Sequence, residues 1–131
     1  MDRRRFALTL AAALPLACAS AAYGQSSTLD GKQFQGVFLE KGKLSGESDR
    51  ITFTNGRFRS SACDRYGYSD AAYQSSAAGD AIAFEAETNS PKYGKLRWRG
   101  VVRGDKLDAT ATMLREGKPP VEHWVVAGAP R

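Results

Sequence analysis

Residues that carry chemistry are scarce in this chain of 131 residues. It has two cysteines, Cys18 and Cys63, and a single histidine, His123. A metal site needs three or four ligands, which one histidine and one cysteine without spaced partners do not supply. There is also no glycine-rich phosphate loop and no Ser/His/Asp arrangement with a local signature. We therefore expect no metal, no cofactor and no enzymatic activity.

Long apolar runs are also missing. The longest apolar stretch, Phe6 to Ala17, is too short to span a bilayer, which needs about 20 residues. Arginines at positions 3–5 precede it and small residues follow it, which is the order of a secretory signal peptide. We expect residues 1–24 to be that signal peptide and the protein to be periplasmic or secreted. Three cleavage positions remain open, after Ala19, Ala21 or Gly24.

The leader leaves its export route open. Arg3, Arg4, Arg5 and Phe6 resemble the twin-arginine export pattern, although Asp2 stands where that pattern usually has Ser or Thr. The general secretory route is the alternative. The tripeptide that ends in Cys18 looks like a lipoprotein acylation box, but proline occupies position 15, where the box has leucine. A lipid anchor at Cys18 is therefore the less favoured reading.

Length, charge and cysteine content limit what the chain after the leader can be. Removing the leader leaves roughly 105 residues, enough for one small domain. The chain carries a formal net charge of +5, and the leader holds three arginines against one aspartate, which leaves +3. This mild charge slightly favours anionic surfaces and does not indicate nucleic-acid binding, and we expect no nucleic-acid partner. One remaining cysteine excludes an internal disulfide, so the domain must rely on its core, a ligand or a partner for stability.

Short alternating runs separated by turn dipeptides predict β-hairpins. Asn55-Gly56, Gly79-Asp80 and Gly104-Asp105 each join two such runs. An Asn-Gly pair between alternating segments is a strong signal for a two-residue hairpin loop. We expect eight strands, at residues 33–39, 49–54, 57–63, 71–77, 81–87, 94–103, 106–114 and 121–127.

Pairing these strands on paper gives each hairpin one apolar face. Around Gly104-Asp105, Trp98 falls opposite Ala111, and Gly100 falls opposite Ala109. The other face carries a basic stripe, which consists of Lys95, Arg97, Arg99 and Arg103. If the next loop is centred near Pro91, Glu87 lies opposite Lys95 and Glu85 lies opposite Arg97, so that ion pairs between the strands account for most of this charge. We expect Trp124, on the last strand, to lie in the core. His123 is expected to be structural or on the surface.

Sequential hairpins with one apolar face must close or stack to bury that face. About eight strands close into an up-and-down barrel whose interior just holds side chains or one small ligand. The short, even connections favour an all-β, eight-stranded antiparallel meander barrel over residues 29–128. A two-sheet sandwich is the alternative.

The order of strands and turns in four segments resembles the calycin, or lipocalin-like, type of small barrel. The segments are LDGKQFQGVF, ITFTNGRFRSS, KLRWRGVVRGDKLDATAT and EHWVVAG. More narrowly, the chain looks like small exported bacterial proteins of that shape without an assigned function. The resemblance covers about residues 29 to 128 and rests on strands and turns. The Gly-x-Trp signature of lipocalins is absent, because Val37 and Phe38 follow Gly36.

The segment FRSSACDRYGYSDAAY, residues 58–73, holds the one cysteine outside the leader. Strict alternation points Ser61 and Cys63 outward, unless a bulge turns the thiol inward. As a site, Cys63 would have Arg65 nearby to lower its pKa. The alternative is a small residue packed at a strand end, which we favour because unpaired buried cysteines usually behave as small hydrophobes.

Three functions remain open from the sequence. The favoured one is binding of a small apolar or aromatic ligand by Cys63, Tyr66, Tyr68, Tyr73 and Trp98. The second is a protein-binding inhibitor or envelope accessory factor that acts through loops 64–72 and 115–120. The third is a redox or covalent role for the Cys63 thiol. A lined cavity would support the first, a solid interior the second, and an accessible thiol of low pKa the third.

Overall fold

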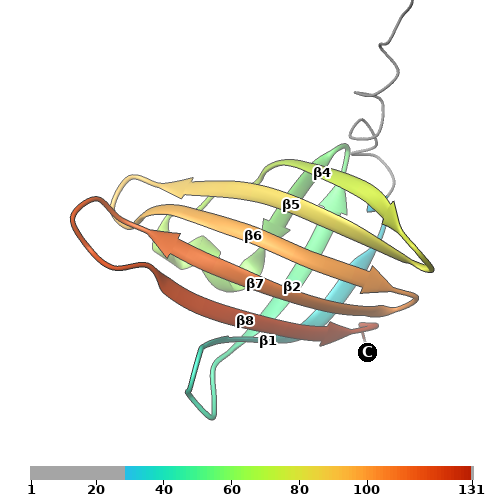
Figure 1. Ribbon diagram of the computed structural model, residues 1–131, viewed down its shortest axis with the longest axis horizontal. Helices are drawn as coiled ribbons and strands as arrows, with labels where there is room; N and C mark the ends of the chain where they lie inside the picture. The colour runs from blue at the N-terminus through green and yellow to red at the C-terminus, as the bar shows by residue number, and fades with distance from the viewer. Residues whose placement is uncertain (1–28, 131) are drawn as a thin grey trace, which may run out of the picture.

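The strands of this protein form one closed barrel. The computed structural model describes residues 29–130. Each strand pairs antiparallel with the next along the chain, and the first pairs with the last (Figure 1). This confirms the predicted eight-stranded antiparallel barrel and excludes the sandwich. The strands are β1 (Gln33–Glu40), β2 (Glu47–Thr54), β3 (Arg57–Ser60), β4 (Ala71–Ala78), β5 (Ala81–Ser90), β6 (Gly94–Arg103), β7 (Lys106–Leu114) and β8 (Val121–Gly128).

The predicted leader is not part of this description. The signal peptide proposed for residues 1–24, and with it Cys18, lies outside the described residues. Within residues 29–130, no helix is both long enough and apolar enough to cross a membrane.

Turn chemistry sets the register of three hairpins, as predicted. Asn55 and Gly56 both have positive φ, 52° and 76°, which a two-residue hairpin loop of this type requires. The turn places Phe53 opposite Phe58. The pairings predicted around Gly79-Asp80 and Gly104-Asp105 are confirmed as well.

Aromatic rings fill the middle of the barrel. Trp98 is fully buried opposite Ala111, whose small side chain leaves room for the indole. Its ring lies 4.7 Å from Phe58 between centroids, and Phe53 packs edge-on against Phe84 at 5.1 Å. Such aromatic pairs bury large areas and add specific ring geometry. The centre of the barrel is therefore a packed core.

The predicted register between β5 and β6 is wrong by two residues. Ser90 pairs with Gly94, so the turn is centred on Lys92 and not on Pro91. Glu87 consequently faces Arg97, and Glu85 faces Arg99. Moving the centre of a hairpin by one residue shifts every pair by two, which keeps each side chain on its face.

Trp124 is not in the core, contrary to the prediction. It is 41% exposed on the outer face of β8, while Val125 and Ala127 point inward. The strand carries apolar residues at both parities, because Trp124 and Val126 alternate with Val125 and Ala127. The pattern of apolar residues therefore could not predict which face of β8 points into the barrel.

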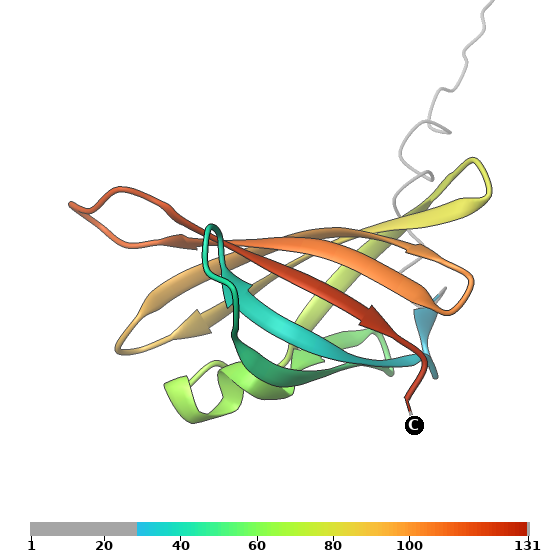
Figure 2. The same cartoon turned by 90° about the horizontal axis from the view of Figure 1, so that it is seen from below.

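The two ends of the barrel differ. At one end lie the tight turns after β2, β4 and β6, and there Leu29 is fully buried. At the other end, on the left in Figures 1 and 2, lie the connections after β5 and β7 and a short 3₁₀ helix, η3 (Ser61–Tyr66). We call this second end the open end. Loop 115–120 and most of loop 64–72 belong to it.

Candidate functional site

A cavity of about 320 Å³ lies at the open end of the barrel. The ends of β1, β2, β6, β7 and β8 contribute to its wall, together with the loop after β1, η3 and the turn after β5. Most of its wall is apolar or aromatic. The main apolar and aromatic side chains are Phe38, Tyr66, Tyr68, Tyr93, Leu96 and Met113.

The helix η3 forms because a buried carboxylate binds its first turn. Strand β3 ends at Ser60, three residues earlier than predicted. Asp49 on β2 is fully buried and accepts hydrogen bonds from Ser60 Oγ at 2.8 Å and from the Ala62 amide at 3.0 Å. Burial raises the pKa of Asp49, and these hydrogen bonds oppose that rise. Gly67, with φ of 87°, ends the helix.

Cys63 faces the cavity instead of the solvent, which corrects the outward orientation expected from strict alternation. The chain has already left the strand at that point, and Cys63 is 4% exposed. Ser60 Oγ, whose proton goes to Asp49, lies 3.4 Å from Sγ. Burial raises the pKa of the thiol to about 12, and Asp49 adds to the rise. Arg65 does not lower it, because its guanidinium pairs with Glu47.

A hydrogen bond and an aromatic contact fix Tyr66 in the cavity wall. Its hydroxyl donates to Glu47 Oε1 at 3.0 Å, and its ring meets Tyr93 edge-on at 5.7 Å. Ser90 Oγ donates to the Tyr66 carbonyl at 2.7 Å and accepts from the amides of Lys92 and Tyr93. One serine thus ties η3 to the turn between β5 and β6, which fixes two sides of the cavity relative to each other.

Two buried polar atoms in this wall have no hydrogen-bond partner. They are the hydroxyl oxygen of Tyr68 and Nδ1 of His123, and within residues 29–130 no other side-chain nitrogen or oxygen is in this state. Both residues line the cavity. Buried polar groups are nearly always hydrogen-bonded, so two such atoms in one cavity require an explanation.

His123 is held in its neutral form. Its ring stacks on Phe38 with centroids 4.8 Å apart. Burial lowers the pKa of His123, and the Glu40 carboxylate and the Ala111 backbone oppose this only in part. The sequence prediction of a structural or surface histidine did not place it in the cavity wall.

Two of the five predicted site residues lie away from the cavity. The Tyr73 hydroxyl donates to Asp30 at 2.8 Å and accepts from the Leu29 amide at 3.1 Å, at the opposite end of the barrel. Trp98 sits in the central core, where its indole donates to Thr88 Oγ1 at 3.3 Å. Trp98 still packs against Phe38, 5.8 Å between centroids, and so supports the cavity from below. The cavity itself brings together Cys63, Tyr66 and Tyr68.

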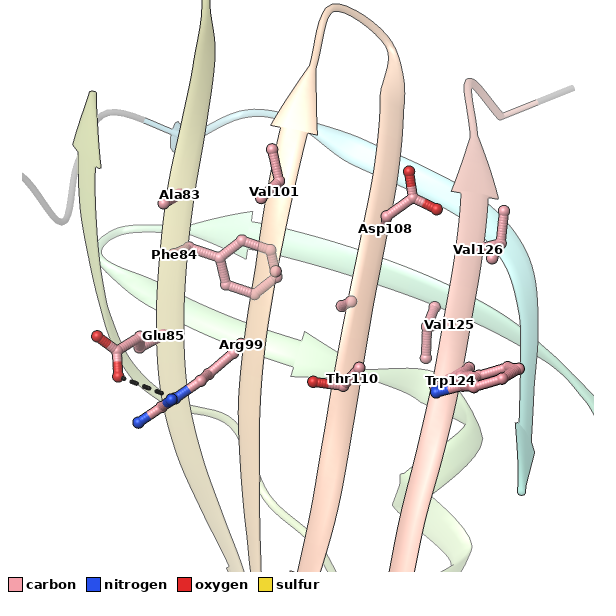
Figure 3. Close-up of a pocket in the computed structure, with 12 residues that line it drawn as sticks. Ala83, Phe84, Glu85, Arg99, Val101, Asp108, Thr110, Trp124, Val125 and Val126 are labelled. Carbon is pink, nitrogen blue, oxygen red and sulfur yellow. Dashed lines mark ion pairs between the residues drawn. The ribbon is translucent and has the colours of Figure 1, made fainter. Parts of the chain in front are cut away.

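A second hollow, of about 660 Å³, lies on the outer surface of β5 to β8 (Figure 3). Trp124 and Val126 on β8 bound one side, and the ion pair between Glu85 and Arg99 bounds the other. It is a wide depression open to the solvent, and no unpartnered buried side-chain atom of the described residues lines it. The cavity at the open end is less exposed to the solvent than this hollow and is the better candidate for a ligand site.

The basic stripe on β6 is largely neutralised. Lys95 and Arg97 lie 3.3 Å and 3.6 Å from Glu87 oxygens, and Arg99 lies 3.6 Å from Glu85. These exposed pairs contribute little stability, but they leave few free cations for a polyanion. In the described part of the chain, no group of three or more His, Cys, Asp or Glu residues could hold a metal ion.

The chain matches no protein-family model, no curated protein and no solved structure. The geometry of the cavity must therefore carry the functional argument by itself. Sequence reasoning missed Phe38, Tyr93, Leu96, Met113 and His123 as members of the wall. One signal was available, because Leu96 and Met113 pair at the end of a hairpin farthest from its turn, on the apolar face.

Proposed function

We propose that this protein is an exported, calycin-like barrel that binds a small apolar or aromatic molecule at its open end and is not an enzyme. The cavity lined by Phe38, Tyr68, Leu96 and Met113 carries this proposal. Its volume of about 320 Å³ is near the lower limit for ligand sites, which suits a molecule of about two fused rings. The leader, with its arginines and short apolar run, supports export to the periplasm or beyond.

The two other functions have less support. A thiol role needs an accessible thiolate, whereas Cys63 is buried with its pKa raised to about 12. A protein-binding role is favoured by exposed apolar residues, namely Leu44 in the loop after β1 and Val37, Trp124 and Val126 on the outer face. These residues do not form an enclosed site, so ligand binding remains the stronger proposal.

The test is titration with N-phenyl-1-naphthylamine, a neutral apolar fluorophore whose emission rises in an apolar site. We expect one binding site per chain. Met113→Trp places a large ring in the cavity wall and should weaken binding at least about tenfold, a change equivalent to about 1.4 kcal/mol. The half-buried position of Met113 leaves room for the larger side chain to be accommodated in the fold.

Thr110→Trp is the matched control. It adds the same ring to the same strand, but on the outer hollow beside Trp124. We expect it to leave the affinity unchanged. Loss of binding in Thr110→Trp with full binding in Met113→Trp would move the site to the outer face. If neither this fluorophore nor the smaller two-ring probe naphthalene binds to the unaltered protein, the proposed function is refuted.

A further inference from the structure

The hydroxyl of Tyr68 is buried and has no hydrogen-bond partner among the described residues. Tyr68 is 6% exposed, and its oxygen is buried without a hydrogen-bond partner. An unsatisfied buried hydroxyl is destabilising relative to a phenyl ring of the same shape. Tyr73 shows the contrast, because its hydroxyl both donates and accepts a hydrogen bond. A phenylalanine would suit the packing at position 68 at least as well.

Nδ1 of His123 is also buried in the cavity wall without a hydrogen-bond partner. The two residues come from different elements, since Tyr68 follows η3 and His123 lies on β8. Both line the cavity, and both bring a polar atom to a wall that is otherwise largely apolar. Two orphaned polar atoms at one cavity indicate a missing partner that enters the cavity.

The wall selects against charge in that partner. Burial raises the pKa of Cys63 and Tyr68 and lowers the pKa of His123, so all three groups are neutral near pH 7. Three charged residues also line the cavity. Glu47 is paired with Arg65, and Glu40 and Lys43 are exposed to the solvent, whereas Tyr68 is buried. A ligand group that is buried beside Tyr68 would therefore lose hydration without gaining an opposite charge.

We propose that the ligand is a planar aromatic molecule with a neutral hydroxyl or carbonyl group, which hydrogen-bonds to the Tyr68 hydroxyl. The inference rests on the proposed function and specifies its ligand. The rings of Phe38, Tyr66 and Tyr93 supply the apolar contacts.

Three probes with one ring system test this inference by calorimetric titration. They are naphthalene, 2-naphthol and 2-naphthoate, which add nothing, a neutral hydroxyl and a carboxylate to the same rings. The measured quantity is the ratio of 2-naphthol affinity to naphthalene affinity. We expect this ratio to be about fivefold higher in the unaltered protein than in Tyr68→Phe, which corresponds to about 1 kcal/mol for one hydrogen bond. We expect 2-naphthoate to bind more weakly than 2-naphthol.

Tyr73→Phe is the control, because Tyr73 also loses a hydroxyl but does not line the cavity. It should keep the affinity ratio of the unaltered protein and lose stability. Tyr68→Phe should keep or gain stability in urea unfolding, which separates a ligand-binding hydroxyl from a structural one. A loss of stability in Tyr68→Phe as large as that in Tyr73→Phe would contradict the inference.

The outcomes separate the two proposals. Equal affinity ratios in the unaltered protein and in Tyr68→Phe, or tighter binding of 2-naphthoate than of 2-naphthol, would overturn the inference. In that case, binding of N-phenyl-1-naphthylamine would still support the proposed function. If neither that fluorophore nor any of the three naphthalene probes binds, both proposals are overturned.

Discussion

Burial, and not the neighbouring residues in the sequence, decides the chemistry of Cys63. Arg65 lies two positions away and could have stabilised a thiolate, but its side chain turns to Glu47. The thiol instead faces a low-dielectric wall with the Asp49 carboxylate nearby. The sequence did not reveal this, because Asp49 comes from another strand. The favoured reading of Cys63 as a packed small residue agrees with its position.

The first prediction concerns the pH dependence that this thiol imposes on stability. The folded pKa of Cys63 is raised to about 12 from an ordinary value of 9.0. Above pH 9 the unfolded chain therefore loses the proton while the folded chain keeps it, so stability falls as pH rises. We expect the stability lost in Cys63→Ala to shrink by about 1.4 kcal/mol between pH 7 and pH 10. Urea unfolding at both pH values measures this difference.

Maleimide labelling provides an independent check on Cys63. The native protein should react far more slowly than the urea-unfolded chain at pH 7, because its thiol is buried and protonated. Equally fast labelling of the folded protein would show that the thiol is accessible, and the redox role would regain its physical basis.

At the scale of elements, hairpins with two-residue turns could be predicted and the others could not. Asn-Gly and Gly-Asp pairs determine loop length, and loop length determines register. The turn after β5 contains Pro91 and Lys92 without such a pair, so its centre was misplaced by one residue. Strand β3 was predicted too long because its end depends on Asp49, a tertiary partner that local patterning does not show.

The second prediction tests whether Asp49 holds η3 in place. Asp49→Ala removes the acceptor for Ser60 Oγ and for the Ala62 amide, and leaves both donors buried. We expect a loss of about 2–4 kcal/mol in the free energy of unfolding, from two unsatisfied groups. Affinity for N-phenyl-1-naphthylamine should also fall, because η3 carries Cys63 and Tyr66 into the cavity wall.

Asp49→Asn is the matched variant, since its amide oxygen can still accept from the Ala62 amide. It should lose clearly less stability than Asp49→Ala and retain most of the binding. Equal losses in the two variants would mean that hydrogen-bond acceptance by Asp49 does not hold η3, and that its shape or charge matters instead.

At the scale of the whole molecule, closure of the barrel could be predicted but the cavity could not. Eight short strands with one apolar face have to close, and their count was readable from the turns. The cavity wall combines the ends of strands that meet only after β1 has paired with β8. Tyr73 and Trp98 were grouped with Tyr68 in one predicted ligand face, yet the structure places Tyr73 at the opposite end of the barrel and Trp98 in the central core.

The last prediction concerns the seam between β1 and β8. Gly36 lies in this seam, and a Cβ built there would stand 2.0 Å from the Val126 carbonyl oxygen and 2.7 Å from the Ala127 Cβ. Backbone cannot yield as a flexible side chain does, so Gly36→Ala must push the two strands apart. We expect a loss of about 1–3 kcal/mol in the free energy of unfolding and faster amide hydrogen exchange along β1 and β8.

Gly128→Ala is the control from the same seam. Gly128 pairs with Gln35, and a Cβ there would meet nothing nearer than the Asp105 carbonyl oxygen at 4.0 Å. It should change stability by less than about 0.5 kcal/mol and leave exchange at the seam unaltered. Equal effects of the two substitutions would mean that close approach at Gly36 does not limit closure. A selective effect of Gly36→Ala would show that this close contact between the first and last strands stabilises the closed barrel on which the cavity depends.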